Sequence, residues 1–201
     1  MKRIKHILKQ VDPFIRKHHM ILLSFFFPII ILEISYAICG IYPFGKRDLL
    51  IIDLYHQYAP FLSDLQEKLK FNSGFLYSWA GGLGTSYIPL YAYYAASPLN
   101  ILTVLFPKEY LTEAVHFLTL LKVGLAGAFF FTYLKGVHNK QGLFTVAFSV
   151  FYALSGYVLT FSWNIMWMDC IYLLPLIMLG LVKLVRDSHG LLFCITLSIA
   201  L

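Results

Sequence analysis

The sequence predicts an all-α protein that crosses a membrane several times, and three observations lead to this fold class. First, 59% of its 201 residues are hydrophobic and 13% are charged, whereas about a quarter of the residues in a soluble domain are charged. Second, several apolar stretches reach about 20 residues, the length that a helix needs to cross a bilayer. Third, the basic residues gather in alternate loops, as they do in multi-pass membrane proteins.

The apolar stretches set the expected organisation of the chain. We expect a basic cytoplasmic tail at 1–19, a large extracytoplasmic loop with amphipathic or interfacial helices at 43–111, and transmembrane helices at 20–42, 112–134, 143–162 and 170–186. The first apolar run is longer than the core of a signal peptide and has no clear A-x-A cleavage site, which favours a retained anchor. Residues 190–201 begin a fifth apolar segment that is too short to cross the hydrocarbon core. We therefore expect this chain to be the N-terminal part of a longer protein.

The distribution of charge predicts that the N-terminus is cytoplasmic. With this orientation, the cytoplasmic segments hold ten basic and two acidic residues, and the extracytoplasmic segments hold five basic and seven acidic ones. This asymmetry follows the positive-inside rule. The basic balance of the chain is therefore a topology signal, and nucleic acid is not an expected partner. The three cysteines fall in apolar runs, and their spacing supports neither a disulfide framework nor a metal site.

An amphipathic helix is predicted just after the first span. Its apolar face repeats at helical spacing and consists of Leu54, Tyr58, Phe61, Leu62, Leu65 and Leu69. The opposite side is expected to face water, and it consists of Gln57, Asp64, Glu67 and Lys68. Pro60 indicates either a kink or a first helical turn near Ala59. Such a helix is expected to lie on the membrane surface.

A second apolar run at 87–106 is long enough to cross the membrane, but the charge distribution opposes a crossing. A crossing there would reverse the orientation of every later segment. The run also contains Pro89 and Pro98, and its four tyrosines at 87, 91, 93 and 94 are typical of the headgroup layer. We expect it to be interfacial or re-entrant.

A glycine-rich stretch, "YSWAGGLGTS", lies between these two segments. Gly81, Gly82 and Gly84 suit a tight turn between interfacial helices. Glycine-rich backbone can also direct its N–H groups toward a phosphate, so a phosphate-binding role remains a second interpretation.

Two charged residues lie inside predicted spans. Glu33 is expected ~20 Å above the inner end of the first span, and Lys122 ~18 Å above the inner end of the second, at 1.5 Å of rise per residue. Charges at such depths are costly unless they are paired or hydrated. Because the depths agree, we predict an ion pair between Glu33 and Lys122; the alternative is that Lys122 extends its amine to the membrane surface.

Four blocks of the chain, "DLYHQYAPF", "YSWAGGLGTS", "YYAASPLNILTVLFP" and "WNIMWMDCIYLLPLIMLG", resemble the YfhO family of bacterial membrane proteins over about residues 20–190. That family is similar to the C-type glycosyltransferases. The resemblance implies a polytopic helical bundle in the bacterial cytoplasmic membrane that takes sugar from a polyprenyl-phosphate carrier. The acceptor would be an extracytoplasmic cell-envelope polymer such as teichoic acid.

The resemblance also implies site residues. C-type enzymes carry an essential acid in the first outward loop, and Asp53 occupies that place here. A carboxylate there would act as general base on the acceptor hydroxyl; the alternative is that Asp53 caps a helix. The expected substrate-binding residues are His56, Gln57, Tyr58, Gly82 and Gly84. His56 would contact a phosphate or assist proton transfer, or it would be an ordinary polar helix residue.

Asp169 is the second candidate catalytic acid. It lies in the short outward turn between the third and fourth spans, which we expect beside the first loop. The alternative is a solvated turn acid. The paired-acid motifs common in the superfamily are not evident, so the sequence implies no metal site and leaves open whether a divalent metal is a cofactor.

Two alternatives to a glycosyltransferase remain. The chain would belong to a transporter or flippase of a lipid-linked sugar if charges near the membrane midplane, here Glu33 and Lys122, carried the function. The third interpretation is that only the longer parent protein is active.

Overall fold

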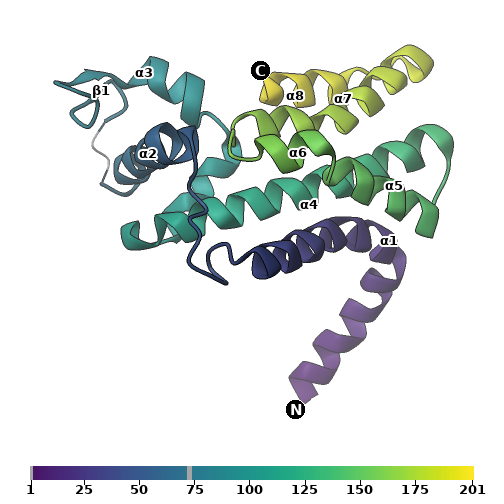
Figure 1. The fold of residues 1–201 in the computed structure, drawn as a ribbon. Coiled ribbons are helices and arrows are strands. Elements are labelled where there is room, and N and C mark those ends of the chain that lie inside the picture. Colours follow the sequence, from purple (N-terminus) through teal and green to yellow (C-terminus); the bar gives the residue numbers. More distant parts are fainter. Residues whose placement is uncertain (1, 72–73) are drawn as a thin grey trace.

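The chain is almost entirely helical. The computed structural model describes residues 2–71 and 74–201, and the side chains within 18–71 and 74–201. The helical bundle in these residues consists of α1 (Lys2–Cys39), α4 (Leu111–His138), α5 (Leu143–Ala153), α6 (Gly156–Phe161), α7 (Trp167–Asp187) and α8 (Leu191–Ala200). Helix α4 runs through the middle of the bundle, with α1 on one side and α7 on the other, and α5 packs against both α4 and α1 (Figure 1).

Four helices in the described residues are long and apolar enough to cross a membrane. They are His18–Cys39, Lys108–His138, Leu143–Phe161 and Trp167–Asp187, and they overlap the four predicted windows. The third combines α5 and α6. These helices confirm the predicted fold class, an all-α polytopic membrane protein.

Helix α1 differs from the prediction at its N-terminal end. The helix begins at Lys2, so the backbone of the expected tail 1–19 is helical from that residue onward. The side chains of residues 1–17, which include six of the basic residues used to orient the chain, lie outside the described ones.

Close contact between α1 and α4 depends on glycine. A Cβ atom at Gly127 would lie 2.1 Å from the backbone oxygen of Ser24, and one at Gly124 would lie 2.7 Å from Cδ1 of Ile29. Real Cβ atoms do not approach other atoms so closely. Small residues of this kind let membrane helices pack backbone to backbone, and α4 is thereby held tightly against α1.

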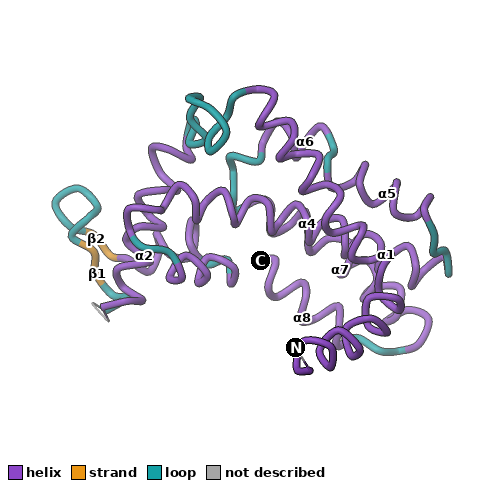
Figure 2. Tube along the Cα trace, turned by 90° about the horizontal axis from the view of Figure 1, so that it is seen from below, coloured by secondary structure: helices purple, strands orange, loops and turns teal. Residues whose placement is uncertain are grey.

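The segment that follows α1 forms a separate group of short elements at one end of the bundle. It contains the π-helical turns η1 (Leu54–Tyr58) and η2 (Tyr91–Ala95), the 3₁₀ helices η3 (Pro98–Leu105) and η4 (Lys108–Tyr110), and the α-helices α2 (Ala59–Phe71) and α3 (Tyr87–Leu90). Two strands, β1 (Tyr77–Ser78) and β2 (Thr85–Ser86), pair antiparallel beside α2 (Figure 2). The glycine-rich stretch is therefore the loop of a β-hairpin, where a turn between helices was predicted.

The apolar run 87–106 is broken. Helices Tyr87–Ala95 and Pro98–Leu105 meet at an angle of 96°. The break falls at Ser97, whose ψ of 125° is extended because the ring of Pro98 disfavours helical backbone in the residue before it. The geometry is that of a broken span or a re-entrant loop, not of a straight transmembrane helix.

The apolar face predicted for 54–69 is the buried one, but two residues on its other side are buried as well. Leu54, Tyr58, Leu62 and Leu65 belong to one hydrophobic core cluster. Asp64 and Lys68 were expected to face water, yet they are 8% and 3% exposed. The reason is that the hairpin folds back over α2.

The contacts of Asp64 and Lys68 hold the hairpin in place. The Ser78 hydroxyl donates a hydrogen bond to Oδ2 of Asp64 at 2.6 Å, and Nζ of Lys68 donates to the backbone oxygens of Tyr77 and Gly74 at 2.7 and 3.0 Å. The same amine lies 4.5 Å from the centre of the Tyr87 ring. Burial of both charges is tolerated because their hydrogen-bonding groups are occupied.

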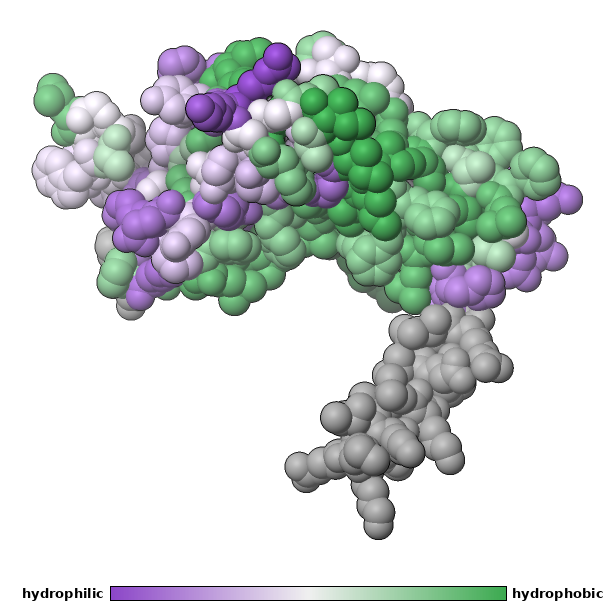
Figure 3. Space-filling view, turned by 60° about the horizontal axis from the view of Figure 1, so that its bottom comes forward, coloured by the Kyte–Doolittle hydropathy of each residue, from purple (hydrophilic) through white to green (hydrophobic). Residues whose placement is uncertain are grey.

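The surface of the bundle is mostly hydrophobic, and hydrophilic patches gather toward its two ends (Figure 3). On α1 the exposed apolar side chains include Phe26, Ile30 and Ile34. The three cysteines are free and exposed. An apolar surface of this kind suits contact with lipid acyl chains.

Cysteine labelling tests the predicted orientation. In a background without the native cysteines, Leu83→Cys should react with an impermeant maleimide in intact cells, because Leu83 is 98% exposed in the segment expected outside. Lys140→Cys is the control at an exposed position on the side expected inside, and it should react only after the cells are opened. The reverse labelling pattern would invert the topology.

Candidate active site

Two π-helical turns pack against each other at the end of the bundle that carries the short elements. The ring of Tyr94 in η2 contacts the rings of Tyr58 in η1 and Phe61 in α2, with centroids 5.4 and 4.7 Å apart. π-Helical turns are rare and occur frequently at functional sites. The contact between two of them therefore makes this region a candidate functional site.

Asp53 lies at the entry to η1, directly after a strained residue. Ile52 has a φ of 49°, and the left-handed region is costly for a β-branched side chain. Such strain costs about 1–3 kcal/mol and clusters at functional sites. Asp53 is half-buried and occupies the N-cap position, but it forms no side-chain capping hydrogen bond with the described backbone. The geometry does not support the helix-capping alternative.

Instead of capping the helix, Asp53 is joined to η2 through one side chain. Nε2 of Gln57 donates a hydrogen bond to Oδ1 of Asp53 at 3.2 Å, and the Tyr94 hydroxyl donates to Oε1 of Gln57 at 2.6 Å. The amide thus donates a hydrogen bond to the carboxylate through its nitrogen and accepts one from the phenol through its oxygen. We call this chain of hydrogen bonds, Asp53–Gln57–Tyr94, the Asp53 relay.

Asp169 lies in the first turn of α7 and is held by a buried lysine. Nζ of Lys122, from α4, is 2.9 Å from Oδ1 of Asp169 and 2.8 Å from the backbone oxygen of Ile165. Oγ of Ser97, at the break between η2 and η3, donates to the same Oδ1 at 3.1 Å. Lys122 is 0% exposed and Asp169 is 7% exposed, so the ion pair is almost fully shielded from water.

These contacts correct the predicted Glu33–Lys122 pair. Oε1 of Glu33 is 2.7 Å from Nε2 of His116 instead, and the His116 ring lies against Tyr36 with centroids 5.7 Å apart. Agreement in depth placed Glu33 and Lys122 at the same level, but depth does not determine toward which neighbour a side chain points. Lys122 points toward α7. Its amine is bonded inside the protein, so it does not extend to the membrane surface either.

A pocket of about 190 Å³ is lined by Tyr94 from the Asp53 relay and by Asp169 from the ion pair, whereas Asp53 and Gln57 do not line it. Its lining comes from η2, from the break before η3, from the start of α7 and from the end of α8, and it includes Tyr93, Tyr94, Ser97, Trp167 and Asp169. Tyr94 belongs to the relay and Asp169 to the ion pair. We call the pocket with these two groups the acid site.

One hydrogen bond fastens η1 to the turn that precedes α7. The Tyr58 hydroxyl donates to Oδ1 of Asn164 at 2.9 Å. Burial raises the pKa of this hydroxyl well above its ordinary value, so it remains a donor at neutral pH. The turn with Asp169 therefore lies beside the first loop, as the sequence analysis expected.

The acid site contains some of the predicted binding residues and not others. Gln57 is part of the relay. Tyr58 is 2% exposed and belongs to the core; its predicted role in substrate binding stays a prediction. His56 is exposed and packs against Tyr55, with ring centroids 5.2 Å apart; its predicted role stays a prediction.

Gly82 and Gly84 lie in the hairpin loop, and neither lines the pocket of the acid site. Gly84 has a local structural function: its φ is 102°, and a Cβ there would lie 1.8 Å from the Tyr77 hydroxyl. Closure of the hairpin therefore requires glycine at this position. A phosphate-binding role of this loop also stays a prediction.

Tyr94 and Ser97 are site residues that were not predicted from the sequence. Tyr94 was grouped with the tyrosines of the headgroup layer, and Ser97 was passed over as part of an apolar run. The available signal was the Ser97–Pro98 dipeptide, which predicts a break in helical backbone and hence a polar side chain free to turn inward. Among the described residues, no group of three or more His, Cys, Asp or Glu side chains is placed to hold a metal ion.

The fold and the site together define a polytopic α-helical membrane protein with a carboxylate-lined pocket at one end of its bundle. Comparison with known families identifies the group within this class. The chain belongs to the YfhO family, described as bacterial membrane protein YfhO, which matches residues 24–201. No match was found among curated proteins or among solved structures.

Proposed function

We propose that the full-length protein is a membrane glycosyltransferase that moves sugar from a polyprenyl-phosphate donor to an extracytoplasmic cell-envelope polymer such as teichoic acid. Membership of the YfhO family supports this class of activity. The observation that carries the proposal is the state of Asp53: a half-buried carboxylate, placed by a strained turn and held by a neutral amide.

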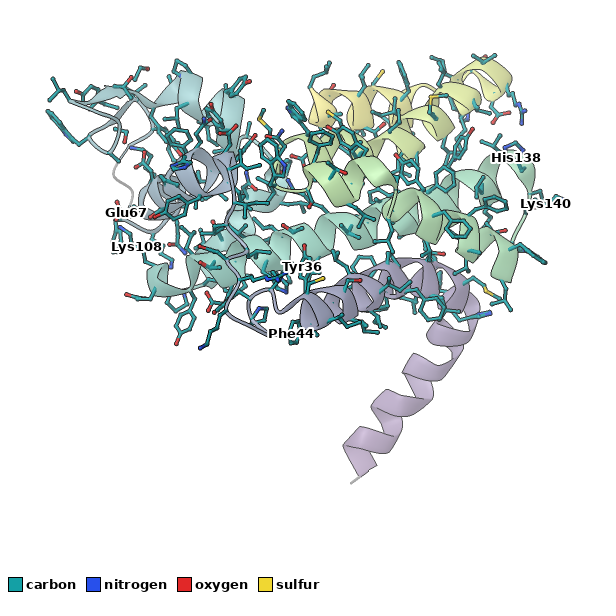
Figure 4. All side chains as sticks on the ribbon, viewed as in Figure 1. Tyr36, Phe44, Glu67, Lys108, His138 and Lys140 are labelled. Carbon is teal, nitrogen blue, oxygen red and sulfur yellow. The ribbon has the colours of Figure 1, made fainter. Side chains whose placement is uncertain are left out.

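Two of the neighbouring acids are paired with lysines, whereas Asp53, like Asp48, Glu109 and Glu113, has no cationic partner in the part of the chain that the structure describes. Glu67 pairs with Lys108 at the surface of the same end of the molecule (Figure 4), and Asp169 pairs with Lys122. Within the described residues, Asp53 has no cation within ion-pair distance. An unpaired carboxylate is the better proton acceptor, because a bound cation stabilises the ionised form and weakens the base.

In the proposed reaction, Asp53 acts as the general base. The acceptor hydroxyl oxygen attacks the anomeric carbon of the donor sugar while its proton passes to the Asp53 carboxylate. The bond between the anomeric carbon and the phosphate oxygen breaks, and its electron pair leaves with the polyprenyl phosphate. Asp53 then releases the proton to water. The Asp53 relay orients the carboxylate, and Lys122 holds Asp169, which lines the neighbouring pocket.

A transporter or flippase of the lipid-linked sugar is the second candidate. The observation that favours it is the break between η2 and η3, bent by 96°, with Ser97 at the break bonded to a buried charge pair. Transporters build their binding sites from such discontinuous helices.

One genetic experiment separates the two functions. The gene is deleted in its own bacterium and restored as full-length wild type, and both the glycan on envelope polymers and the leaflet that holds the donor lipid are measured. A transferase predicts loss of glycan with donor accumulating in the outer leaflet. A flippase predicts the same loss with donor accumulating in the inner leaflet, and unchanged glycan would contradict both functions.

A further inference from the structure

A second pocket lies at the opposite end of the bundle from the acid site. It has a volume of about 440 Å³ and opens between α1, α4 and α7. Its lining includes Ile21, Phe131, Lys135, Leu179 and Lys183. We call it the basic-end pocket.

The basic-end pocket is cationic at its rim. Lys135 and Lys183 are both exposed; Lys135 lies in the last turn of α4, and Lys183 lies four residues before the end of α7. His18 and His19 of α1 line the pocket as well. Asp187, the acid at the end of α7, lies within ion-pair distance of neither lysine in the part of the chain that the structure describes.

The inner wall of the same pocket is apolar. Phe131 and Leu179 are 3% and 5% exposed, and they lie one turn deeper in α4 and α7 than the two lysines. Ile21 contributes the third apolar side chain, from α1. A charged rim above an apolar wall suits a ligand with an anionic head and a hydrocarbon body.

The position of the pocket along the spans matches the level of lipid headgroups. Lys135 and Lys183 lie within four residues of the ends of their spans at His138 and Asp187. Figure 4 shows His138 and Lys140 at this end of the bundle, away from Glu67 and Lys108. Basic pockets between membrane helices at this level bind anionic headgroups.

We propose that the basic-end pocket binds the phosphate headgroup of an anionic phospholipid, with Lys135 and Lys183 contacting the phosphate and with Ile21, Phe131 and Leu179 contacting the acyl chain. This inference is independent of the proposed function, because it uses neither the acid site nor the sugar donor. Free phosphate carries negative charge as the lipid headgroup does. Only a lipid also has an acyl chain that can contact the apolar wall.

The test is lipid binding by the purified chain, measured by native mass spectrometry in detergent. Phosphatidylglycerol is titrated against phosphatidylcholine with the same acyl chains, and inorganic phosphate is added as competitor. We expect wild type to retain phosphatidylglycerol in preference to phosphatidylcholine. Each lysine near a membrane surface strengthens binding to anionic lipid by roughly fivefold, so Lys135→Gln with Lys183→Gln should weaken phosphatidylglycerol binding by about 30-fold.

The matched control is Lys140→Gln with Arg186→Gln. It removes the same charge from the same end of the bundle, but neither residue lines the basic-end pocket, so lipid preference should stay at the wild-type level. All four positions are exposed, and the folds of the variants are compared by their melting temperatures. Equal loss in the two double variants, or equal retention of the two lipids by wild type, would overturn the proposal. Displacement of the lipid by millimolar inorganic phosphate would overturn the assignment to a lipid.

Discussion

Asp53→Asn in the full-length protein is expected to lower glycosyl transfer by about 10²–10⁴-fold, the usual contribution of a general base. The amide cannot accept the proton of the acceptor hydroxyl. It retains an oxygen that can accept the hydrogen bond from Gln57, so the turn should keep its structure. The measurement is the initial rate of sugar transfer from a polyprenyl-phosphate donor by the purified full-length variant.

The matched control is Asp48→Asn, a second acid of the same segment. Oδ1 of Asp48 accepts a hydrogen bond from the backbone nitrogen of Leu50 at 2.9 Å, a local contact that asparagine can also form. This variant should transfer sugar at close to the wild-type rate. If Asp53→Asn were as active as Asp48→Asn, the base would have to be another residue, and Asp169 would be the next candidate.

Tyr94→Phe tests the Asp53 relay without removing the proposed base, Asp53. Removal of the hydroxyl breaks the hydrogen bond to Gln57 but leaves the carboxylate of Asp53 in place. A hydrogen bond of this kind contributes about 1 kcal/mol, so the expected loss of transfer is only about fivefold. A loss as large as that of Asp53→Asn would indicate that the Tyr94 hydroxyl contacts the substrate itself.

Lys122→Met is expected to lower the free energy of unfolding by about 3–5 kcal/mol, because it leaves the Asp169 carboxylate buried without its cation. Asp169→Leu should cost a similar amount, since it leaves the Lys122 ammonium, which is 0% exposed, without its anion. The double variant should be more stable than either single one, because no unpaired buried charge remains. Reversible unfolding in mixed detergent micelles measures all three.

A second double-mutant cycle provides the control for the Lys122–Asp169 pair. Glu33→Gln combined with Lys122→Met should give additive losses, within about 0.5 kcal/mol, because the two side chains share no contact and Glu33 contacts His116. Additive losses for Lys122 and Asp169, together with strong coupling between Glu33 and Lys122, would restore the pairing that depth alone predicted.

The periodicity of 54–69 shows where prediction from the sequence succeeded and where it stopped. The spacing of Leu54, Tyr58, Leu62 and Leu65 identified the face that is buried, because that face is set by local helical geometry. It also predicted that Asp64 and Lys68 would face water. That prediction failed because the hairpin, which returns from a later part of the chain, covers them and supplies their hydrogen-bond partners.

The residues of the acid site were likewise predicted only in part from the sequence. Asp53, Gln57 and Asp169 were candidates from the sequence, since polar side chains beside apolar spans are conspicuous. Tyr94 and Ser97 were not, because their function depends on a bend of 96° and on contacts across 37 and 72 residues of chain. No local pattern encodes such contacts.

The sequence by itself determined the class of protein, the approximate spans and the family, because hydropathy, charge asymmetry and short motifs are properties of consecutive residues. The tertiary structure alone decided which charges pair. Hydropathy places a residue along the membrane normal, and Glu33 and Lys122 were placed at matching depth in this way. The direction in which a side chain leaves its helix axis, and the helix that it meets there, follow only from packing, and packing joined Lys122 to Asp169 and Glu33 to His116.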